Sequence, residues 1–150
     1  MRTFDRLADL ASFEGREIGA SDWVSVDQSR IDLFAQATGD AQWIHVDAAR
    51  AAAGPFGATV AHGFLTLSLL SELSAAAFRI ADVRMGLNYG LDRVRFPSPV
   101  PVDSRLRAVC VLDKFETMAG GAQLTLTVTI EREGGAKPAC VAQWVTRHLV

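Results

Sequence analysis

Hydrophobic and polar residues alternate most regularly in the second half of the chain. Leucine, valine and isoleucine occupy every second position over residues 124–130, with threonines between them, and residues 106–112 show a similar period of two. Because successive side chains of a strand point to opposite faces, this pattern predicts strands with one buried face. Longer apolar runs predict further strands over residues 83–96 and 139–149, and a glycine pair predicts a hairpin turn over 133–136.

The first half of the chain follows the period of a helix instead. Four residues fall on one helical face at spacings of three and four: Ile31, Phe34, Ala35 and Thr38. Asp27 is placed to accept hydrogen bonds from the first turn of this helix, and Gly39 to end it in the left-handed conformation. Three smaller elements are expected beside it: a short helix over 4–14, a strand over 18–26, and an alanine turn over 48–53 that Asp47 caps.

Residues 63–79 predict a second helix, which is apolar on nearly every side. A helix of this kind is normally buried, so it is expected to lie in the core with other elements around it. Gly86 and Gly90 are candidate bulges in the strand that follows. One central helix followed by a run of antiparallel strands indicates the α+β class, and 150 residues without repeat or linker indicate one domain, residues 1–150.

Composition narrows the possible functions. The chain is 49% hydrophobic and 21% charged, and its formal net charge of -2 gives no reason to expect nucleic acid or a membrane surface as partner. The N-terminus lacks the apolar core of a signal peptide, and the longest apolar stretch, residues 64–78, is too short to span a bilayer. We therefore expect a cytoplasmic protein. Cys110 and Cys140 lie in separate strand-like runs, which favours small buried side chains over a redox or metal-binding role.

Two short segments carry the candidate chemistry. Asp40 and His45 are five residues apart in a loop after the first helix, and Gly63 begins the apolar helix with a backbone N–H that has no partner within that helix. A carboxylate and an imidazole transfer protons, and a helix N-terminus stabilises a developing oxyanion. Taken singly, Asp40 is more typical of a turn and His45 of a hydrogen-bonded, partly buried histidine. Together the three predict an enzyme that adds or removes water.

The order and spacing of these residues resemble a known family. D-x-x-x-x-H-x-D over residues 40–47, followed by A-H-G-x-L-x-x-S over 61–68, is similar to the motifs of the MaoC-like, (R)-specific enoyl-CoA hydratases. The Gly-Pro-Phe-Gly turn at 54–57 and the segment 88–97 resemble the NodN-like branch of that superfamily, although Gln42-Trp43 stands where many members carry Asn-Pro.

The resemblance implies the hot-dog fold, in which an antiparallel sheet wraps a central helix, and a homodimer with its active site at the dimer interface. It implies reversible hydration of a trans-2-enoyl-CoA to the (R)-3-hydroxyacyl-CoA in fatty-acid metabolism, with no metal or redox cofactor. Asp40 and His45 are then the catalytic pair, with the roles of acid and base left open between them. The Gly63 N–H is expected to bind the thioester oxygen.

Each of the remaining candidate residues has a functional interpretation and a simpler structural one. Ser68 is expected near the catalytic pair, or else to bond the carbonyl four residues back in its helix. Gln42 is expected to orient water or thioester, or else to be a solvated amide. Trp43, Ile44 and Phe56 would suit the wall of an acyl tunnel, but such residues are more often core. Four arginines, more typical of a solvated sheet face, could contact CoA phosphates: Arg93, Arg95, Arg105 and Arg107.

Two other functions remain compatible with the sequence. A hot-dog acyl-CoA thioesterase would hydrolyse the thioester with a carboxylate on the central helix, where Glu72 stands two turns beyond the helix start. A non-catalytic acyl-thioester-binding protein would share the fold without turnover.

Overall fold

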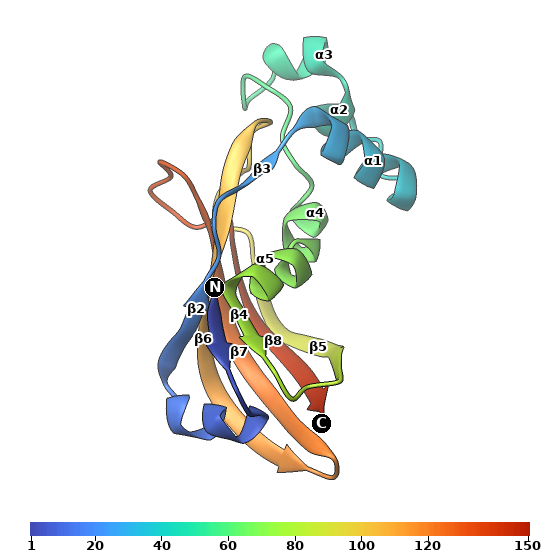
Figure 1. The fold of residues 1–150 in the computed structure, drawn as a ribbon. Helices are drawn as coiled ribbons and strands as arrows, with labels where there is room; N and C mark the ends of the chain where they lie inside the picture. Colours follow the sequence, from blue (N-terminus) through green and yellow to red (C-terminus); the bar gives the residue numbers. More distant parts are fainter.

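A six-stranded antiparallel sheet dominates the computed structural model, which describes residues 1–150 (Figure 1). The strands follow the order β2-β6-β7-β8-β5, and β3 also pairs with β6. Their bounds are β2 (Arg16–Ala20), β3 (Val24–Val26), β5 (Met85–Arg95), β6 (Ser104–Met118), β7 (Gly121–Arg132) and β8 (Cys140–Leu149). The sheet is strongly curved, and its strands β6, β7 and β8 pair in the simple meander that the alternating pattern predicts.

The buried face of the sheet is the one that the period of two predicts. Every second residue is fully buried over 106–112 of β6 and 124–130 of β7: Leu106, Ala108, Cys110 and Leu112, then Leu124, Leu126, Val128 and Ile130. These side chains belong to one core cluster of 28 residues, which also holds the buried side of the central helix. Burial of this apolar face supplies the main favourable term in folding.

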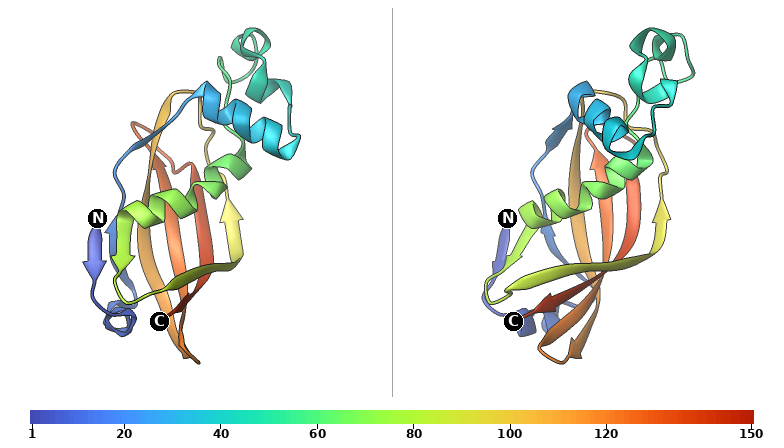
Figure 2. Two further views of the ribbon diagram at one scale, coloured as in Figure 1. Left: turned by 45° about the vertical axis from the view of Figure 1, so that its right-hand side comes forward. Right: turned by 90° about the vertical axis from the view of Figure 1, so that its right-hand side faces the viewer.

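The central helix lies across the concave side of the sheet (Figure 2). It consists of α4 (Gly63–Ser68) and α5 (Leu70–Ala77), separated at Leu69, but hydrogen bonds from Leu69 N to Leu65 O at 3.1 Å and from Leu73 N to Leu69 O at 2.9 Å keep its path nearly continuous. The sheet around this helix is the predicted α+β, hot-dog architecture.

Two expectations about this helix are corrected. It ends at Ala77 rather than 79, because β4 (Phe78–Ile80) pairs in parallel with β1 (Arg2–Phe4), and this pairing extends the chain there. It is also covered on one side only, since Phe64 is 71% exposed. The helix end approaches β2 so closely that a Cβ on Gly19 would collide with the Ala77 carbonyl.

The N-terminal elements also differ from the prediction. The helix expected over 4–14 is the 3-10 helix η1 (Leu7–Phe13). The strand expected over 18–26 is divided into β2 and β3 by residues 21–23. Ser21 N still donates to Ala108 O at 2.9 Å, but Ala108 N donates to the Ser21 hydroxyl at 3.0 Å, so a side chain replaces one backbone acceptor of the ladder at that point.

Three helices project beyond one end of the sheet, beside the start of α4 (Figures 1 and 2). They are α1 (Gln28–Thr38), α2 (Trp43–Val46) and α3 (Ala48–Ala52). The predicted caps are confirmed: Asp27 accepts from Arg30 N at 2.9 Å and Asp47 from Arg50 N at 3.0 Å. Gly39 ends α1 with φ 77°, a conformation that favours glycine. This end carries the predicted catalytic residues.

Strand β5 forms an open edge of the sheet. It pairs only with β8, and its apolar side chains are exposed: Met85, Leu87, Tyr89 and Leu91. The register shifts between Asn88 and Gly90, which confirms the bulge predicted at Gly90, whereas Gly86 stays in register opposite His148. Among the helices, none has both the length and the apolarity to cross a membrane.

Candidate active site

Asp40, His45 and His62 meet at the junction of the projecting helices with the central helix. Asp40 comes from the loop after α1, His45 from α2, and His62 from the position just before α4. One side-chain oxygen or nitrogen of each lies within 4.8 Å of the others. The folding of 38–47 against 61–63 therefore unites the two segments in which the sequence places the chemistry.

His45 is held in one tautomer by the backbone. The side chain is buried, and its Nδ1 lies 2.6 Å from the carbonyl oxygen of Val60. Because a carbonyl oxygen only accepts, Nδ1 carries the hydrogen of this bond. In the neutral ring Nε2 is then a free acceptor, which is the form needed to take a proton from water.

His62 contacts both predicted catalytic residues. It is 2% exposed, its Nε2 donates to the backbone oxygen of Asp40 at 2.9 Å, and its ring stacks on that of His45 with centroids 3.8 Å apart and planes at 24°. Phe34 packs against His62 with centroids 5.0 Å apart. The other ring nitrogen, Nδ1, is buried without a hydrogen-bond partner.

From the sequence alone, His62 is not expected in the catalytic set. Its role depends on contacts with Asp40 and His45, which lie twenty-two and seventeen positions earlier in the chain, and spacing does not reveal such contacts. The one available signal is the scarcity of histidine, since the chain has only three and two of them lie within the motifs.

The Asp40 side chain is exposed and enters no ion pair in the structure. Its Oδ1 accepts a long hydrogen bond from Gln42 N at 3.4 Å. The backbone of Asp40 is fixed by His62 while the carboxylate keeps most of its capacity to accept hydrogen bonds. A water molecule between Asp40 and His45 would fit the separation of these groups.

Gln28 supports α2 from the first turn of α1. Its amide nitrogen donates to the backbone oxygen of His45 at 2.8 Å, and its amide oxygen accepts from the Thr59 hydroxyl at 2.6 Å. These bonds hold α2 between α1 and the segment 59–60. They fix the position of the His45 ring relative to Val60.

Gly63 is the first residue of α4, and its N–H makes no hydrogen bond within the protein. It borders a hollow of about 270 Å³ that Phe56, Ala61, Thr66 and Phe96 also line. A Cβ on Gly63 would lie 3.2 Å from the Phe96 ring. The absence of a side chain thus leaves the backbone N–H open to the hollow.

The remaining predicted residues divide between the site and the scaffold. Phe56 lines the hollow beside Gly63 and is 45% exposed. The guanidinium carbon of Arg50 lies 4.5 Å from the centroid of the Trp43 ring. Ile44 is half-buried, and its backbone oxygen accepts a hydrogen bond from Val60 N at 3.0 Å. Both support the backbone around His45.

In the structure, Gln42 is a solvated amide and Ser68 bonds a carbonyl within its own helix, the simpler of the two interpretations given for each. The Gln42 side chain is exposed and makes no hydrogen bond, although its backbone oxygen accepts from His45 N at 2.9 Å. The Ser68 hydroxyl donates to Phe64 O at 2.7 Å, within its own helix, and no hydrogen bond joins it to Asp40 or His45. Their parts in substrate binding remain predictions.

Three charged residues considered in the sequence analysis, Glu72, Arg105 and Arg107, lie in ion pairs. Glu72 lies 3.3 Å from an Arg30 nitrogen on the surface. Arg105 pairs with Glu133 and Arg107 with Glu131, at 3.1 and 2.7 Å, which agrees with a solvated sheet face for these two arginines.

Asp40, His45 and His62 are also the only cluster in the structure with the composition of a metal site. Each imidazole uses one ring nitrogen for a backbone carbonyl, Nδ1 of His45 for Val60 and Nε2 of His62 for Asp40, so one nitrogen of each ring remains available. The free Nε2 of His45 and the Asp40 carboxylate have the composition needed for proton transfer.

The two cysteines lie in the core, away from this chemistry. Burial raises the pKa of Cys110 to about 12 and that of Cys140 to about 11. Thiols that resist ionisation are poor nucleophiles and poor metal ligands. This agrees with the small buried side chains expected from the sequence.

Comparison with known proteins places the chain in a family. The model of the MaoC like domain matches residues 9–133. The chain is 53% identical over 150 residues to 3-hydroxyacyl-thioester dehydratase Z of Mycobacterium tuberculosis, with 99% of each chain covered. It is 52% identical over 144 residues to nodulation protein N of Rhizobium leguminosarum bv. viciae, covering 93% of this chain and 89% of that protein.

Solved structures agree on the fold. R-hydratase PhaJ1 of Pseudomonas aeruginosa superposes with a TM-score of 0.74 at 21% identity, covering 91% of this chain and 81% of the other. The chain therefore belongs to the MaoC-like dehydratase family and has its hot-dog fold. It is a hydro-lyase, and its similarity to nodulation protein N supports the NodN-like branch predicted from the sequence.

Proposed function

We propose that this protein is an (R)-specific enoyl-CoA hydratase, which adds water reversibly to a trans-2-enoyl-CoA to give the (R)-3-hydroxyacyl-CoA. The observation that carries the proposal is the free Nε2 of His45, fixed by the Val60 carbonyl and placed in one cluster with the exposed carboxylate of Asp40. The name of the mycobacterial relative, a 3-hydroxyacyl-thioester dehydratase, describes the same reaction in reverse.

The tautomer of His45 supports its assignment as the base. In hydration, Nε2 takes one proton from a water whose other hydrogen bonds to the Asp40 carboxylate. The water oxygen forms its bond to Cβ as the double-bond electrons move toward the thioester. The proton on the imidazolium then passes to Cα on the same face, so one hydroxyl and one proton have been added. Positioned groups of this kind contribute about 10²–10⁴-fold.

Gly63 is proposed to stabilise the intermediate enolate. As charge moves onto the thioester oxygen, the unpaired N–H at the start of α4 can donate to it. Loss of one such donor typically costs about 10²–10³-fold. The hollow lined by Phe56 and Phe96 gives the thioester its approach to this N–H.

The proposal includes a homodimer formed through β5. This strand is eleven residues long, lies at the sheet edge and exposes Met85, Leu87, Tyr89 and Leu91. An open apolar edge favours pairing with another strand, and two copies related by a two-fold axis would join their sheets there. An acyl-CoA substrate, a cytoplasmic location and the absence of a metal or redox cofactor complete the proposal.

The thioesterase alternative has less support. Glu72, its candidate carboxylate, is exposed on α5 and lies beside Arg30 instead of entering the cluster around His45. A non-catalytic binding protein would not need the His45 tautomer or the free Asp40 carboxylate.

The test follows loss of the conjugated thioester absorbance of crotonyl-CoA in wild type, Asp40→Asn, His45→Gln and Glu72→Ala. The first two variants should remain folded and lose about 10²-fold or more of activity, while Glu72→Ala retains it. Loss of activity in Glu72→Ala alone, with release of free thiol, would establish the thioesterase instead.

A further inference from the structure

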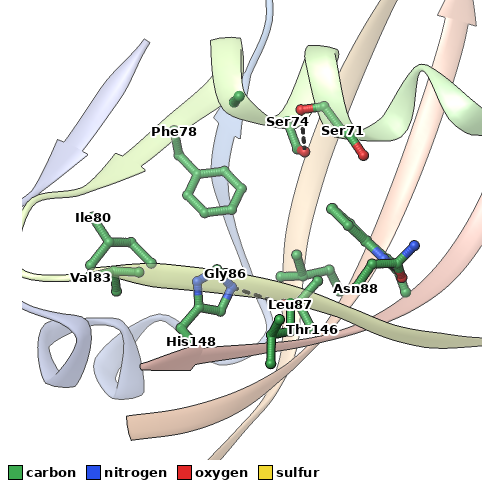
Figure 3. Close-up of a pocket in the computed structure, with 13 residues that line it drawn as sticks. Ser71, Ser74, Phe78, Ile80, Val83, Gly86, Leu87, Asn88, Thr146 and His148 are labelled. Atoms are coloured by element: carbon green, nitrogen blue, oxygen red, sulfur yellow. Dashed lines mark hydrogen bonds between the residues drawn. The ribbon is translucent and has the colours of Figure 1, made fainter. Parts of the chain in front are cut away.

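A second cavity, of about 420 Å³, lies between α5 and the strands β5 and β8 (Figure 3). One part of its wall is apolar, formed by Phe78, Ile80, Val83, Leu87 and Leu126. The rest is polar but uncharged, formed by Ser71, Ser74, Asn88, Thr146 and His148. A plain alkyl chain would need only the apolar part of this lining.

Several of these polar groups keep hydrogen-bonding capacity. His148 Nε2 and the Thr146 hydroxyl bond to each other at 3.0 Å, which leaves His148 Nδ1 without a protein partner. The Asn88 oxygen accepts from Trp144 Nε1 at 2.8 Å, while the Asn88 amide nitrogen makes no hydrogen bond. The Ser71 hydroxyl also has no partner. Figure 3 shows His148 and Thr146 together near Leu87, with Ser71 across the cavity.

The cavity continues toward the proposed active site. A smaller hollow of about 160 Å³ shares Ser71, Asn88 and Trp144 with it and extends to Phe64 and Ser68 on α4. The two spaces thus follow the central helix from Phe64, the residue after Gly63, toward its C-terminal end, while Gly63 itself borders the separate hollow beside Phe96. Eleven residues separate Gly63 from Ser74, which corresponds to about 16 Å along a helix.

We propose that this cavity binds the distal part of the substrate's acyl chain and selects chains that carry a neutral oxygen function there, a hydroxyl or a carbonyl. The proposal rests on the proposed function, because it takes the acyl thioester to be bound at Gly63. A plain alkyl chain would displace water from His148, Asn88 and Ser71 without replacing its hydrogen bonds, which disfavours binding.

The electrostatics of the cavity favour a neutral group. No acidic or basic side chain lines it apart from His148, whose pKa is lowered by burial, so the ring is neutral at pH 7. A carboxylate in this place would be desolvated without a cation to pair with. A hydroxyl can both donate to His148 Nδ1 and accept from the Asn88 amide.

The experiment compares kcat/KM for trans-2-decenoyl-CoA and 10-hydroxy-trans-2-decenoyl-CoA. Wild type should prefer the hydroxylated chain by about tenfold or more, since sites that bond a substrate hydroxyl reject the analogue without it. In His148→Phe and in Thr146→Val the ratio of the two values should fall toward one or reverse. The ratio is the readout because it cancels a general loss of activity.

Thr125→Val is the matched control, since Thr125 lies on the opposite face of β7 from Leu124 and Leu126, which face the core. It should keep the wild-type ratio. Equal kcat/KM for both chains in wild type, or a ratio unaffected by His148→Phe, would overturn the proposal.

Crotonyl-CoA, too short to reach the cavity, reports on the proposed function separately. If wild type does not hydrate it, the proposed reaction fails, and the cavity is then tested by the Kd of saturated decanoyl-CoA against 10-hydroxydecanoyl-CoA. Tighter binding of the hydroxylated chain, lost in His148→Phe, supports the cavity proposal in that case as well. Equal affinities reject it.

Discussion

Replacement of His62 by phenylalanine should separate stability from activity. The variant keeps a ring of similar shape against His45 and Phe34, whose centroids lie 3.8 and 5.0 Å away, but loses the hydrogen bond from Nε2 to the Asp40 oxygen. It also removes the buried Nδ1 that has no partner.

The two changes have opposite effects on the free energy of unfolding. Loss of the hydrogen bond costs about 0.5–1.5 kcal/mol, and removal of a buried unpaired polar atom recovers about 1–3 kcal/mol. The ring contacts are retained. His62→Phe should therefore be as stable as wild type or somewhat more stable, within about 2 kcal/mol.

Activity should fall because Asp40 is no longer held beside His45. We expect kcat for crotonyl-CoA hydration to decrease by about tenfold or more with little change in KM, since general acid–base catalysis depends on this placement. His62→Gln, which keeps an N–H able to reach the Asp40 oxygen but lacks the ring, should recover part of kcat while being less stable.

Urea unfolding and steady-state kinetics on the same preparations measure both effects. Wild-type kcat in His62→Phe would refute the positioning role of His62. Loss of activity in proportion to loss of stability would show a structural role only.

Three further predictions concern other parts of the molecule. Gly63→Pro, which removes the N–H at the first position of α4, where a helix tolerates proline, should lower kcat/KM for crotonyl-CoA by about 10²–10³-fold in a folded protein, and near-wild-type kinetics would contradict the role of this N–H. Cys110 and Cys140, with pKa values raised to about 12 and 11 by burial, should resist iodoacetamide at pH 8 until the protein is unfolded; mass spectrometry showing alkylation of the native protein would contradict this. Burial lowers the pKa of His148 below its usual 6.5, so below that pH the unfolded chain binds more protons than the folded one, and the free energy of unfolding should decrease on acidification. The urea midpoint of His148→Phe should therefore depend less on pH between about 7 and 5 than that of wild type. An unchanged pH dependence would exclude this residue as a cause.

The sequence predicts the features that depend only on residues close together in the chain. The alternation over 124–130 identifies the buried face of β7, and the caps at Asp27, Gly39 and Asp47 form as expected because each depends only on the adjacent turn. The segments predicted to carry the catalytic pair could likewise be singled out, since Asp40 and His45 lie five residues apart in sequence, and the structure brings the two side chains together.

Pairings between distant segments could not be predicted in this way. The end of α5 is set by β1, more than seventy residues earlier, and the break in the first long strand by the bond between Ser21 and Ala108. The contacts of His62 with Asp40 and His45 also require the folded chain. Tertiary contacts override local preference at each of these points.

The central claim is that this chain hydrates a 2-enoyl thioester at the Asp40–His45 pair, and the most direct test is the product that wild type forms from crotonyl-CoA. The account predicts (R)-3-hydroxybutyryl-CoA by chiral analysis, with no free CoA thiol released and a rate of product formation lower by about 10²-fold or more in Asp40→Asn. Release of free thiol with the double bond intact, or formation of the (S) product, would contradict it.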